Sequence, residues 1–525
     1  MNTELLVLLP VLLPMMAAAL SVVTWRSPLA QRVIGVGGTL ALLVVGIVLL
    51  MVTWDQGIIT MEMSGFAPPF GIVLVSDLLS AMMVLMTGIM GFTVVVYSLA
   101  TTGEDYERFG YYPLMHLLHA GVAGAFLTGD IFNLYVWFEV MLVASFALLI
   151  LGGKRSQMEG AVKYVTINLV SSMIFLTAIG LTYGLVGSLN MAHIAQVLQG
   201  SESPMVTVVA SMYLVAFAIK AGSFPLFFWL PASYHTPPVA VSALFAGLLT
   251  KVGAYALFRF FTLIFTQDVE FTHNILLWGG AITMITGVLG AAAQFEMRRI
   301  LSIHIISQIG YMLMALGLLA DPDLPPEVGQ LAIAGGIFYI IHNIIVKTNL
   351  FLVAGVVYRL MGTYKLKKLG GIYRRKPFLA LLFFVPALSL GGLPPLSGFF
   401  AKFAVIRAGL EAMEWYVVAI GLVTGLLTMY SMVKIWLYAF WRPAPEGHPN
   451  VHRLEEPNTT DIWVMYFPII LLGISTVVLG VYGEPFFELT LAAADQLLNP
   501  SEYIEAVGLE SEIQHAIESI DDGGE

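Results

Sequence analysis

The sequence contains no cysteine and few charged residues. Of its 525 residues only 11% are Asp, Glu, Lys or Arg, whereas soluble domains are about a quarter charged. The absence of cysteine excludes disulfides and thiolate metal sites. A formal net charge of −10 argues against a nucleic-acid partner, because such proteins carry basic surfaces. The chain also lacks a Walker-type phosphate loop and a zincin motif, so we expect no enzymatic activity, no metal site and no cofactor.

Long apolar runs are what the sequence has in abundance. Hydrophobic residues make up 58% of the chain, and there are 50 glycines, which membrane helices tolerate at their contacts. A run of about 20 apolar residues is long enough to cross a bilayer. We therefore predict an all-α polytopic membrane protein with about fourteen transmembrane helices. The predicted spans are residues 4–23, 32–53, 74–98, 112–129, 131–151, 163–186, 205–224, 239–263, 273–294, 300–319, 331–358, 378–410, 415–440 and 462–483.

Two of the spans are interrupted by proline and glycine. One break lies at residues 224–238 and the other at residues 391–395. Proline removes a backbone donor and clashes with the preceding turn. Such breaks persist at membrane depth only where protein or a water-filled cavity satisfies the freed backbone groups.

Basic residues concentrate in the loops after odd-numbered helices, and acidic residues in the loops on the other face. Arg298 and Arg299 illustrate the first group, and Asp321 and Asp323 the second. The positive-inside rule then places the odd-numbered loops in the cytoplasm. We expect a multi-pass protein of a prokaryotic cell membrane with both termini on the outer face. The first apolar run follows Glu4 rather than a basic segment, so we interpret it as a membrane helix and not as a signal peptide.

The tail after Pro485 is acidic and can be drawn as one amphipathic helix from about Ser501 to Ile520. Two interpretations stay open. The tail is either a solvated appendage or a contact for a partner subunit.

Ionisable side chains deep inside apolar spans are the most informative residues. Each charged group at a helix centre costs about 2.5–3.5 kcal/mol on insertion scales, so a purely structural span would carry leucine instead. In an apolar environment an ammonium group gives up its proton more readily, and a nearby carboxylate opposes this. We therefore predict a proton relay along a hydrated path, with Glu139 as the partner of Lys220. The relay residues are Glu139, Lys220, Lys251, His304, His342, Lys347 and Lys402.

Other polar residues within the spans have simpler explanations. We expect Lys434 to extend towards solvent from near its helix end. Asp77 and Asp130 lie near helix starts, where carboxylates favour the helix dipole. His116 and His119 are interpreted as packing histidines with satisfied hydrogen bonds. No compact cluster of oxygen ligands marks a sodium pathway in this chain.

Several of these segments resemble the large antiporter-like subunits shared by the Mrp-type sodium/proton antiporters and the membrane arm of respiratory complex I. The resemblance covers residues 70–440 and is closest to the D-type subunits of the Mrp family. The motifs that carry it are GAFLTGDIFNLYVWFE (124–139), KYVTINLVSS (163–172), FPLFFWLP (224–231), LTKVG (249–253), HIISQIGY (304–311) and PALSLGGLPPLSGF (386–399).

The resemblance implies two inverted five-helix repeats with helices seven and twelve discontinuous. It implies that Glu139 and Lys220 form the glutamate–lysine pair of the family and that Lys251 is the central relay. Lys402 would match a helix-twelve residue that is lysine in the Mrp D-type subunits and glutamate in some complex I relatives. The expected division of the chain is an N-terminal three-helix segment, two repeats, and a last helix with the acidic tail. Their ranges are 1–111, 112–265, 266–440 and 441–525.

Two functions follow from the resemblance. The first is a proton-translocating subunit of a multisubunit antiporter, with partner subunits, protons, sodium ions and the lipid bilayer as its contacts. The second is a proton-pumping subunit of complex I or of a membrane-bound hydrogenase. Lysine at position 402 and the motif around Glu139 favour the first.

Overall fold

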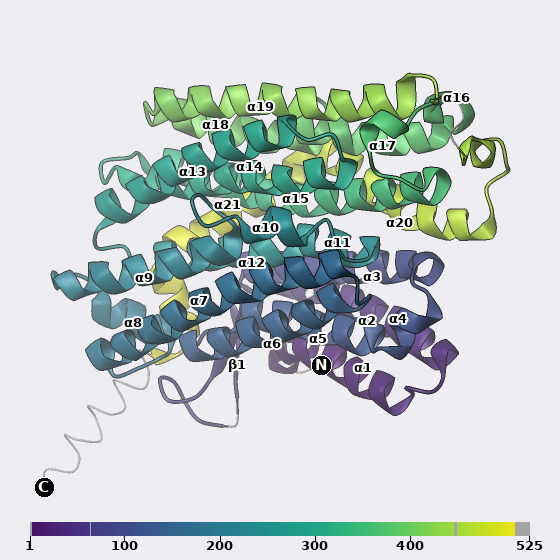
Figure 1. Cartoon of the computed structure of the whole chain (residues 1–525). Helices are drawn as coiled ribbons and strands as arrows, with labels where there is room; N and C mark the ends of the chain where they lie inside the picture. The colour runs from purple at the N-terminus through teal and green to yellow at the C-terminus, as the bar shows by residue number, and fades with distance from the viewer. Residues whose placement is uncertain (1–2, 64, 446–448, 510–525) are drawn as a thin grey trace, which may run out of the picture.

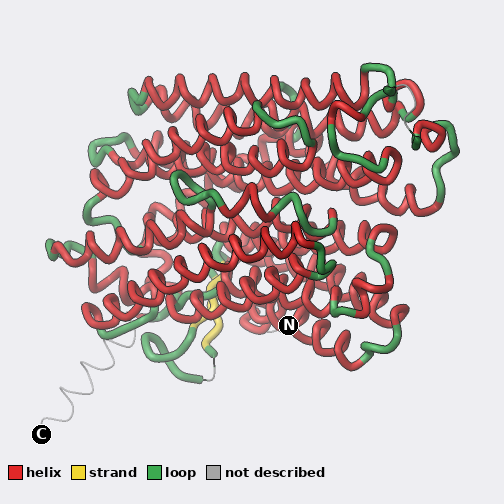
Figure 2. Tube along the Cα trace, viewed as in Figure 1, coloured by secondary structure: helices red, strands yellow, loops and turns green. Residues whose placement is uncertain are grey.

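Long helices lying side by side make up nearly all of the structure (Figure 1). The computed structural model describes residues 3–63, 65–445 and 449–509. The loops gather at the two opposite ends of the helices, as a bilayer-spanning bundle requires, and the only strands within the described residues form one small hairpin (Figure 2).

The first half of the chain supplies the N-terminal helices and the hairpin. Its elements are α1 (Thr3–Val23), α2 (Pro28–Gln56), β1 (Ile59–Glu62), β2 (Val73–Ser76), α3 (Leu78–Thr101), α4 (Glu104–Arg108), α5 (Tyr111–Leu127), α6 (Ile131–Ile150), α7 (Arg155–Val186), α8 (Met191–Leu198), α9 (Pro204–Ala221), α10 (Trp229–Ser233), α11 (Val239–Leu244) and α12 (Thr250–Leu263). A π-helical turn, Phe245–Leu249, joins α11 to α12.

The second half continues the bundle. Its helices are α13 (Val269–Ala292), α14 (Met297–Gly317), α15 (Pro326–Met361), α16 (Ile372–Arg375), α17 (Pro377–Gly391), α18 (Ser397–Glu411), α19 (Trp415–Ile435), α20 (Thr460–Val481), α21 (Gly483–Leu498) and α22 (Pro500–Ala506). Short 3-10 turns lie at Leu318–Ala320, Leu366–Lys368 and Val451–Leu454, and a second π-helical turn, Trp436–Trp441, follows α19.

Every predicted span overlaps a helix of the structure. Twelve helices in the described part of the chain are long and apolar enough to cross a membrane. The two remaining predicted spans are residues 112–129, which form the 17-residue α5, and residues 378–410, which divide into α17 and α18. The multi-helix membrane architecture is therefore confirmed, while the count of fourteen crossings and the inverted repeats stay predictions.

Both predicted breaks are present, and nearby side chains satisfy the freed backbone groups. At the first break, Trp229 Nε1 donates to Ile219 O at 3.0 Å, and Thr283 Oγ1 accepts from Phe224 N at 2.9 Å. At the second break, Ser389 Oγ accepts from Gly398 N at 3.2 Å. The helices before the two breaks, α9 and α17, are each followed by a glycine with positive φ, Gly222 (80°) and Gly392 (89°). Residues with a side chain rarely adopt this conformation.

The chain after the last long helix is packed against the bundle. α21 contacts α3, α12 and α15, and Leu497 and Tyr503 are buried. Of the two interpretations of the tail, the solvated appendage is therefore wrong for residues 485–509. The prediction of one helix from Ser501 to Ile520 is also wrong, because α22 ends at Ala506 and Gly508 has a φ of 84°; residues 510–520 lie outside the described part.

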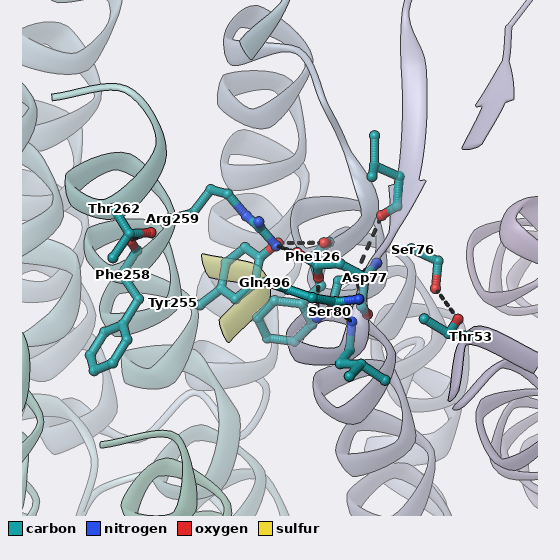
Figure 3. A network of polar contacts seen from close by, with 12 residues as sticks. Thr53, Ser76, Asp77, Ser80, Phe126, Tyr255, Phe258, Arg259, Thr262 and Gln496 are labelled. Carbon is teal, nitrogen blue, oxygen red and sulfur yellow. Dashed lines mark hydrogen bonds and ion pairs between the residues drawn. The ribbon is translucent and has the colours of Figure 1, made fainter. Parts of the chain in front are cut away.

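A buried ion pair joins α3, α12 and the C-terminal helices (Figure 3). Arg259 Nη2 lies 2.5 Å from Asp77 Oδ2, and both side chains are buried. Asp77 also caps α3, as expected, by accepting from Ser80 N at 2.9 Å. Tyr503 covers the Arg259 guanidinium at 5.2 Å, and Gln496 accepts from the backbone N–H of Leu78. The C-terminal segment therefore closes over a charge pair that the sequence analysis did not identify.

Three further expectations are tested by the packing. Asp130 caps α6 by accepting from Asn133 N at 2.7 Å, as expected. Lys434 does not reach solvent; it is buried and donates to Ala292 O and Gln294 O at the end of α13. The packing histidines are not satisfied as predicted, because His116 Nε2 and both ring nitrogens of His119 lack a hydrogen-bond partner in the described structure.

Candidate proton-transfer site

Glu139 and Lys220 are joined through a serine. Ser172 of α7 donates to the carboxylate of Glu139 on α6, and Lys220 Nζ on α9 donates to the same hydroxyl at 3.2 Å. The Lys220 ammonium also lies over the Phe138 ring, 5.1 Å from its centroid. The predicted pair is therefore close in space, and Ser172 is the bridge between its members.

Lys220 is the penultimate residue of α9, at the end where that helix contacts α12. The backbone there approaches so closely that a Cβ added at Gly253 would lie 2.5 Å from Ala221 N. Lys251 is two residues before Gly253 on α12. The close contact therefore places the end of α9 that carries Lys220 next to the start of α12 that carries Lys251.

Lys251 lies at the start of α12, directly after the π-helical turn. Its Nζ donates to Ala246 O within that turn at 2.6 Å. Helix α15 packs on the other side, where a Cβ added at Gly247 would overlap Thr348 Oγ1. π-helical turns inside α-helices occur frequently at functional sites, and here the turn supplies the acceptor for a fully buried ammonium.

Lys347 and His304 occupy the centre of the second half. Lys347 Nζ on α15 lies 3.4 Å from Leu301 O on α14, and it is within electrostatic reach of Lys251 and Lys402. His304 Nδ1 is 3.2 Å from Ser307 Oγ, which accepts from Gln308 Nε2. Tyr339 OH donates to Gln308 Oε1 at 2.5 Å. A hydrogen-bonded group therefore extends from His304 towards Tyr339.

Lys402 closes the row on α18. Its Nζ donates to Leu390 O at 2.9 Å and to Gly391 O at 3.2 Å, the freed carbonyls at the end of α17. The ammonium also lies 5.3 Å from the centroid of the Tyr311 ring, and this ring packs at a tilt against Tyr339, with the ring centroids 5.0 Å apart.

His342 lies beside the same break. His342 Nδ1 is 2.9 Å from Ser397 Oγ, and Ser397 Oγ is 3.2 Å from Ser389 Oγ. These hydroxyls lie on either side of the break between α17 and α18. The second broken helix therefore presents hydroxyl groups to His342, as well as carbonyls to Lys402.

The seven predicted residues, called the row below, lie on α6, α9, α12, α14, α15 and α18. These helices follow one another across the stack from α6 to α18 (Figure 1). The four lysines and two histidines are 0–9% exposed, whereas Glu139, predicted to be deep in its span, is only partly buried. Several polar atoms along the row have no partner within the described structure, among them His304 Nε2, His342 Nε2 and both amide atoms of Asn343. Buried groups of this kind are normally satisfied by ordered water. No group of three His, Asp or Glu residues suited to a metal ion occurs among the described residues.

Sequence reasoning missed the hydroxyl and amide groups that connect the charges. Ser172, Gln308 and Ser397 fall within motifs quoted above, but nothing in the sequence distinguished them. Serine in a helix most often bonds its own backbone, as Ser21 does with Ala17 O. A serine that bridges two helices therefore has no sequence signal without knowledge of the packing.

Comparison with known proteins identifies the family. The family model described as "NADH:quinone oxidoreductase/Mrp antiporter, TM" matches residues 128–428. The chain belongs to this family. The matched region contains all seven residues of the row, so the candidate site lies within the part of the chain that the family model matches.

Individual relatives agree with this assignment. The chain is 45% identical to the D-type subunit of the Na(+)/H(+) antiporter of Alkalihalophilus pseudofirmus, over 96% of this chain and 99% of that protein. It superposes with a TM-score of 0.85 and 31% identity on a chain of the Mrp complex from Dietzia sp. DQ12-45-1b, covering 97% of this chain and 100% of that one. A chain of respiratory complex I from Thermus thermophilus has a TM-score of 0.78 at 23% identity, covering 94% and 99%, and shows the same fold.

Proposed function

We propose that this chain is the proton-translocating D-type subunit of a multisubunit sodium/proton antiporter driven by the proton motive force. It works in the cell membrane of a prokaryote, with both termini outside and with other antiporter subunits as partners. The observation that carries the proposal is the Glu139–Ser172–Lys220 bridge at one end of a buried row of lysines. The 45% sequence identity to a sodium/proton antiporter subunit, over 96% of this chain, favours this function over a redox-driven pump.

The row transfers protons because its charges influence one another. A carboxylate and an ammonium that lie close together each favour the charged form of the other. Two neighbouring ammonium groups each disfavour the charged form of the other. In this proposal Glu139 holds the proton on Lys220 through Ser172. A rearrangement that weakens this bridge releases the proton towards Lys251, across the close contact at Gly253.

Beyond Lys251, repulsion between ammonium groups favours a state in which neighbouring lysines are not protonated at the same time. Lys347 lies within electrostatic reach of both Lys251 and Lys402, so an added proton on one lysine favours the release of a proton from its neighbour. His304 and His342, with their free ring nitrogens, accept and pass protons through water between Lys347 and Lys402. This path runs across the stack of helices, in the plane of the membrane.

The test removes each member of the bridged pair in the assembled complex. Glu139→Gln and Lys220→Ala are each expected to abolish sodium-dependent pH change in everted vesicles. Glu159→Gln and Lys163→Ala, exposed positions on α7, are the matched controls and are expected to leave the rate unchanged. An affinity tag measures how much complex is present. A Glu139→Gln complex that assembles fully and transports at the normal rate would show that the pair is structural.

A further inference from the structure

A cavity of about 650 Å³ opens at the lysine- and arginine-rich end of the bundle, the end marked by α4 and α16 in Figure 1. It lies between the C-terminal ends of α3 and α15 and the N-terminal ends of α7, α11 and α14. Helix ends of both polarities meet there, so their dipoles oppose one another. The side-chain charges therefore decide the sign of the potential in the cavity.

Those side chains are positive. Lys154, Arg298, Arg359 and Arg453 line the cavity, and no carboxylate does. Arg359 is paired, because its Nη2 lies 3.2 Å from Asp461 Oδ2. Lys154, Arg298 and Arg453 have no carboxylate within ion-pair distance in the described structure.

Arg298 is the most informative of the four, because it is only 6% exposed. Its Nη2 donates to Pro237 O and Ser242 Oγ, both at 2.7 Å, and its guanidinium lies over the Tyr364 ring. Its Nε has no acceptor among the described residues. The acidic residue nearest in sequence, Glu296, caps α14 by accepting from Arg299 N. Glu296 interacts electrostatically with Arg298 but is not within ion-pair distance of it. A buried guanidinium without a carboxylate in direct contact is costly, and a bound anion would lower that cost.

We propose that this cavity binds a phosphate-bearing anion, with Arg298 in its wall and Lys154 and Arg453 at its rim. Guanidinium groups fit phosphate oxygens through two parallel N–H bonds, and lysine adds a point charge. Two sources share this chemistry: free inorganic phosphate and the headgroup of an anionic phospholipid. Basic pockets between membrane helices on the positive side are suited to the second, and the cavity reaches Met465 on α20.

The site also has a structural connection to the relay. Arg298 bonds Ser242 on α11, and α11 continues through the π-helical turn to Lys251. A bound anion that holds Arg298 therefore also steadies the segment that carries the Ala246 acceptor of Lys251. The binding itself does not depend on the proposed function.

The test uses the complete complex, purified through an affinity tag on this chain and stripped of loosely held lipid. The cavity variant is Lys154→Gln/Arg453→Gln, which changes two exposed side chains and leaves helix packing intact. The matched control is Lys368→Gln/Arg374→Gln, which removes two exposed charges from the same end of the bundle outside the cavity. Inorganic phosphate is titrated by calorimetry at constant ionic strength. Retention of phosphatidylglycerol and of phosphatidylcholine is measured by native mass spectrometry.

We expect one saturable site in the wild-type complex. Binding of inorganic phosphate would assign free phosphate, and selective retention of one phosphatidylglycerol would assign the lipid headgroup. In either case binding falls by at least about tenfold in the cavity variant and stays near the wild-type value in the control. The proposal is overturned if neither probe binds, if both variants lose binding equally, or if phosphatidylcholine is retained as well as phosphatidylglycerol.

Discussion

The bridge between Glu139 and Lys220 can be tested with one hydroxyl group. Ser172 donates to the carboxylate and accepts from the ammonium, so Ser172→Ala removes both bonds without changing either charge. A hydrogen bond to a charged group contributes about 1.5–3 kcal/mol. Since about 1.4 kcal/mol corresponds to a factor of ten, we expect sodium/proton exchange to fall by roughly tenfold to a hundredfold.

The neighbouring serine provides a matched control. Ser171 is equally buried on α7, but its hydroxyl donates to the backbone carbonyl of Ala216 and touches neither charge. Ser171→Ala should therefore cost about 1 kcal/mol of stability and leave the exchange rate near normal. Ser172→Thr keeps a hydroxyl and should retain most of the activity.

The assay is the initial rate of sodium-dependent pH change in everted vesicles, divided by the amount of tagged complex. The reasoning predicts that Ser172→Ala differs from Ser171→Ala in rate while the two assemble to a similar level. Equal rates in the two alanine variants would refute the bridge, because the missing hydroxyl would then have no bearing on the charge pair.

Three other outcomes are expected. Lys402→Arg should assemble but lose most exchange, because arginine keeps its charge while a relay lysine must be able to release its proton; full activity would leave Lys402 as a fixed charge. Asp77→Asn should destabilise the purified complex by about 3–5 kcal/mol, since it leaves Arg259 buried and unpaired, whereas Glu411→Gln at an exposed pair should cost less than about 1 kcal/mol; equal thermal midpoints would contradict this. Vesicles that contain only this polypeptide should show no sodium/proton exchange, and measurable exchange there would show that the partner subunits are not needed.

Much of the architecture is encoded locally along the chain. Apolar runs of sufficient length predicted the helices, and Phe224-Pro225 and Pro394-Pro395 predicted the two breaks. These features are visible in sequence because a bilayer imposes a length and a composition on each segment separately. The buried charges were visible for the same reason, since a lysine such as Lys251 in an apolar run is costly wherever the helix packs.

The contacts between segments depended on the tertiary structure. Ser172, Ser397 and Gln308 became recognisable only once their helices were packed, because their side chains bond partners on other elements or extend a network between helices. The error at the C-terminal segment has the same origin. Gln496 accepts a hydrogen bond from the backbone N–H of Leu78, which lies 418 residues earlier in the chain. A partner so distant in sequence leaves no periodic signal.

Local composition therefore determined which segments cross the membrane and which of their charges are costly. Packing alone determined that Arg259 pairs with Asp77 and that Ser172 links Glu139 to Lys220. The physical reason is that the insertion cost of a side chain depends on its own surroundings, whereas a hydrogen bond or an ion pair depends on a second group. In a helical bundle the position of that group is set only when the helices meet.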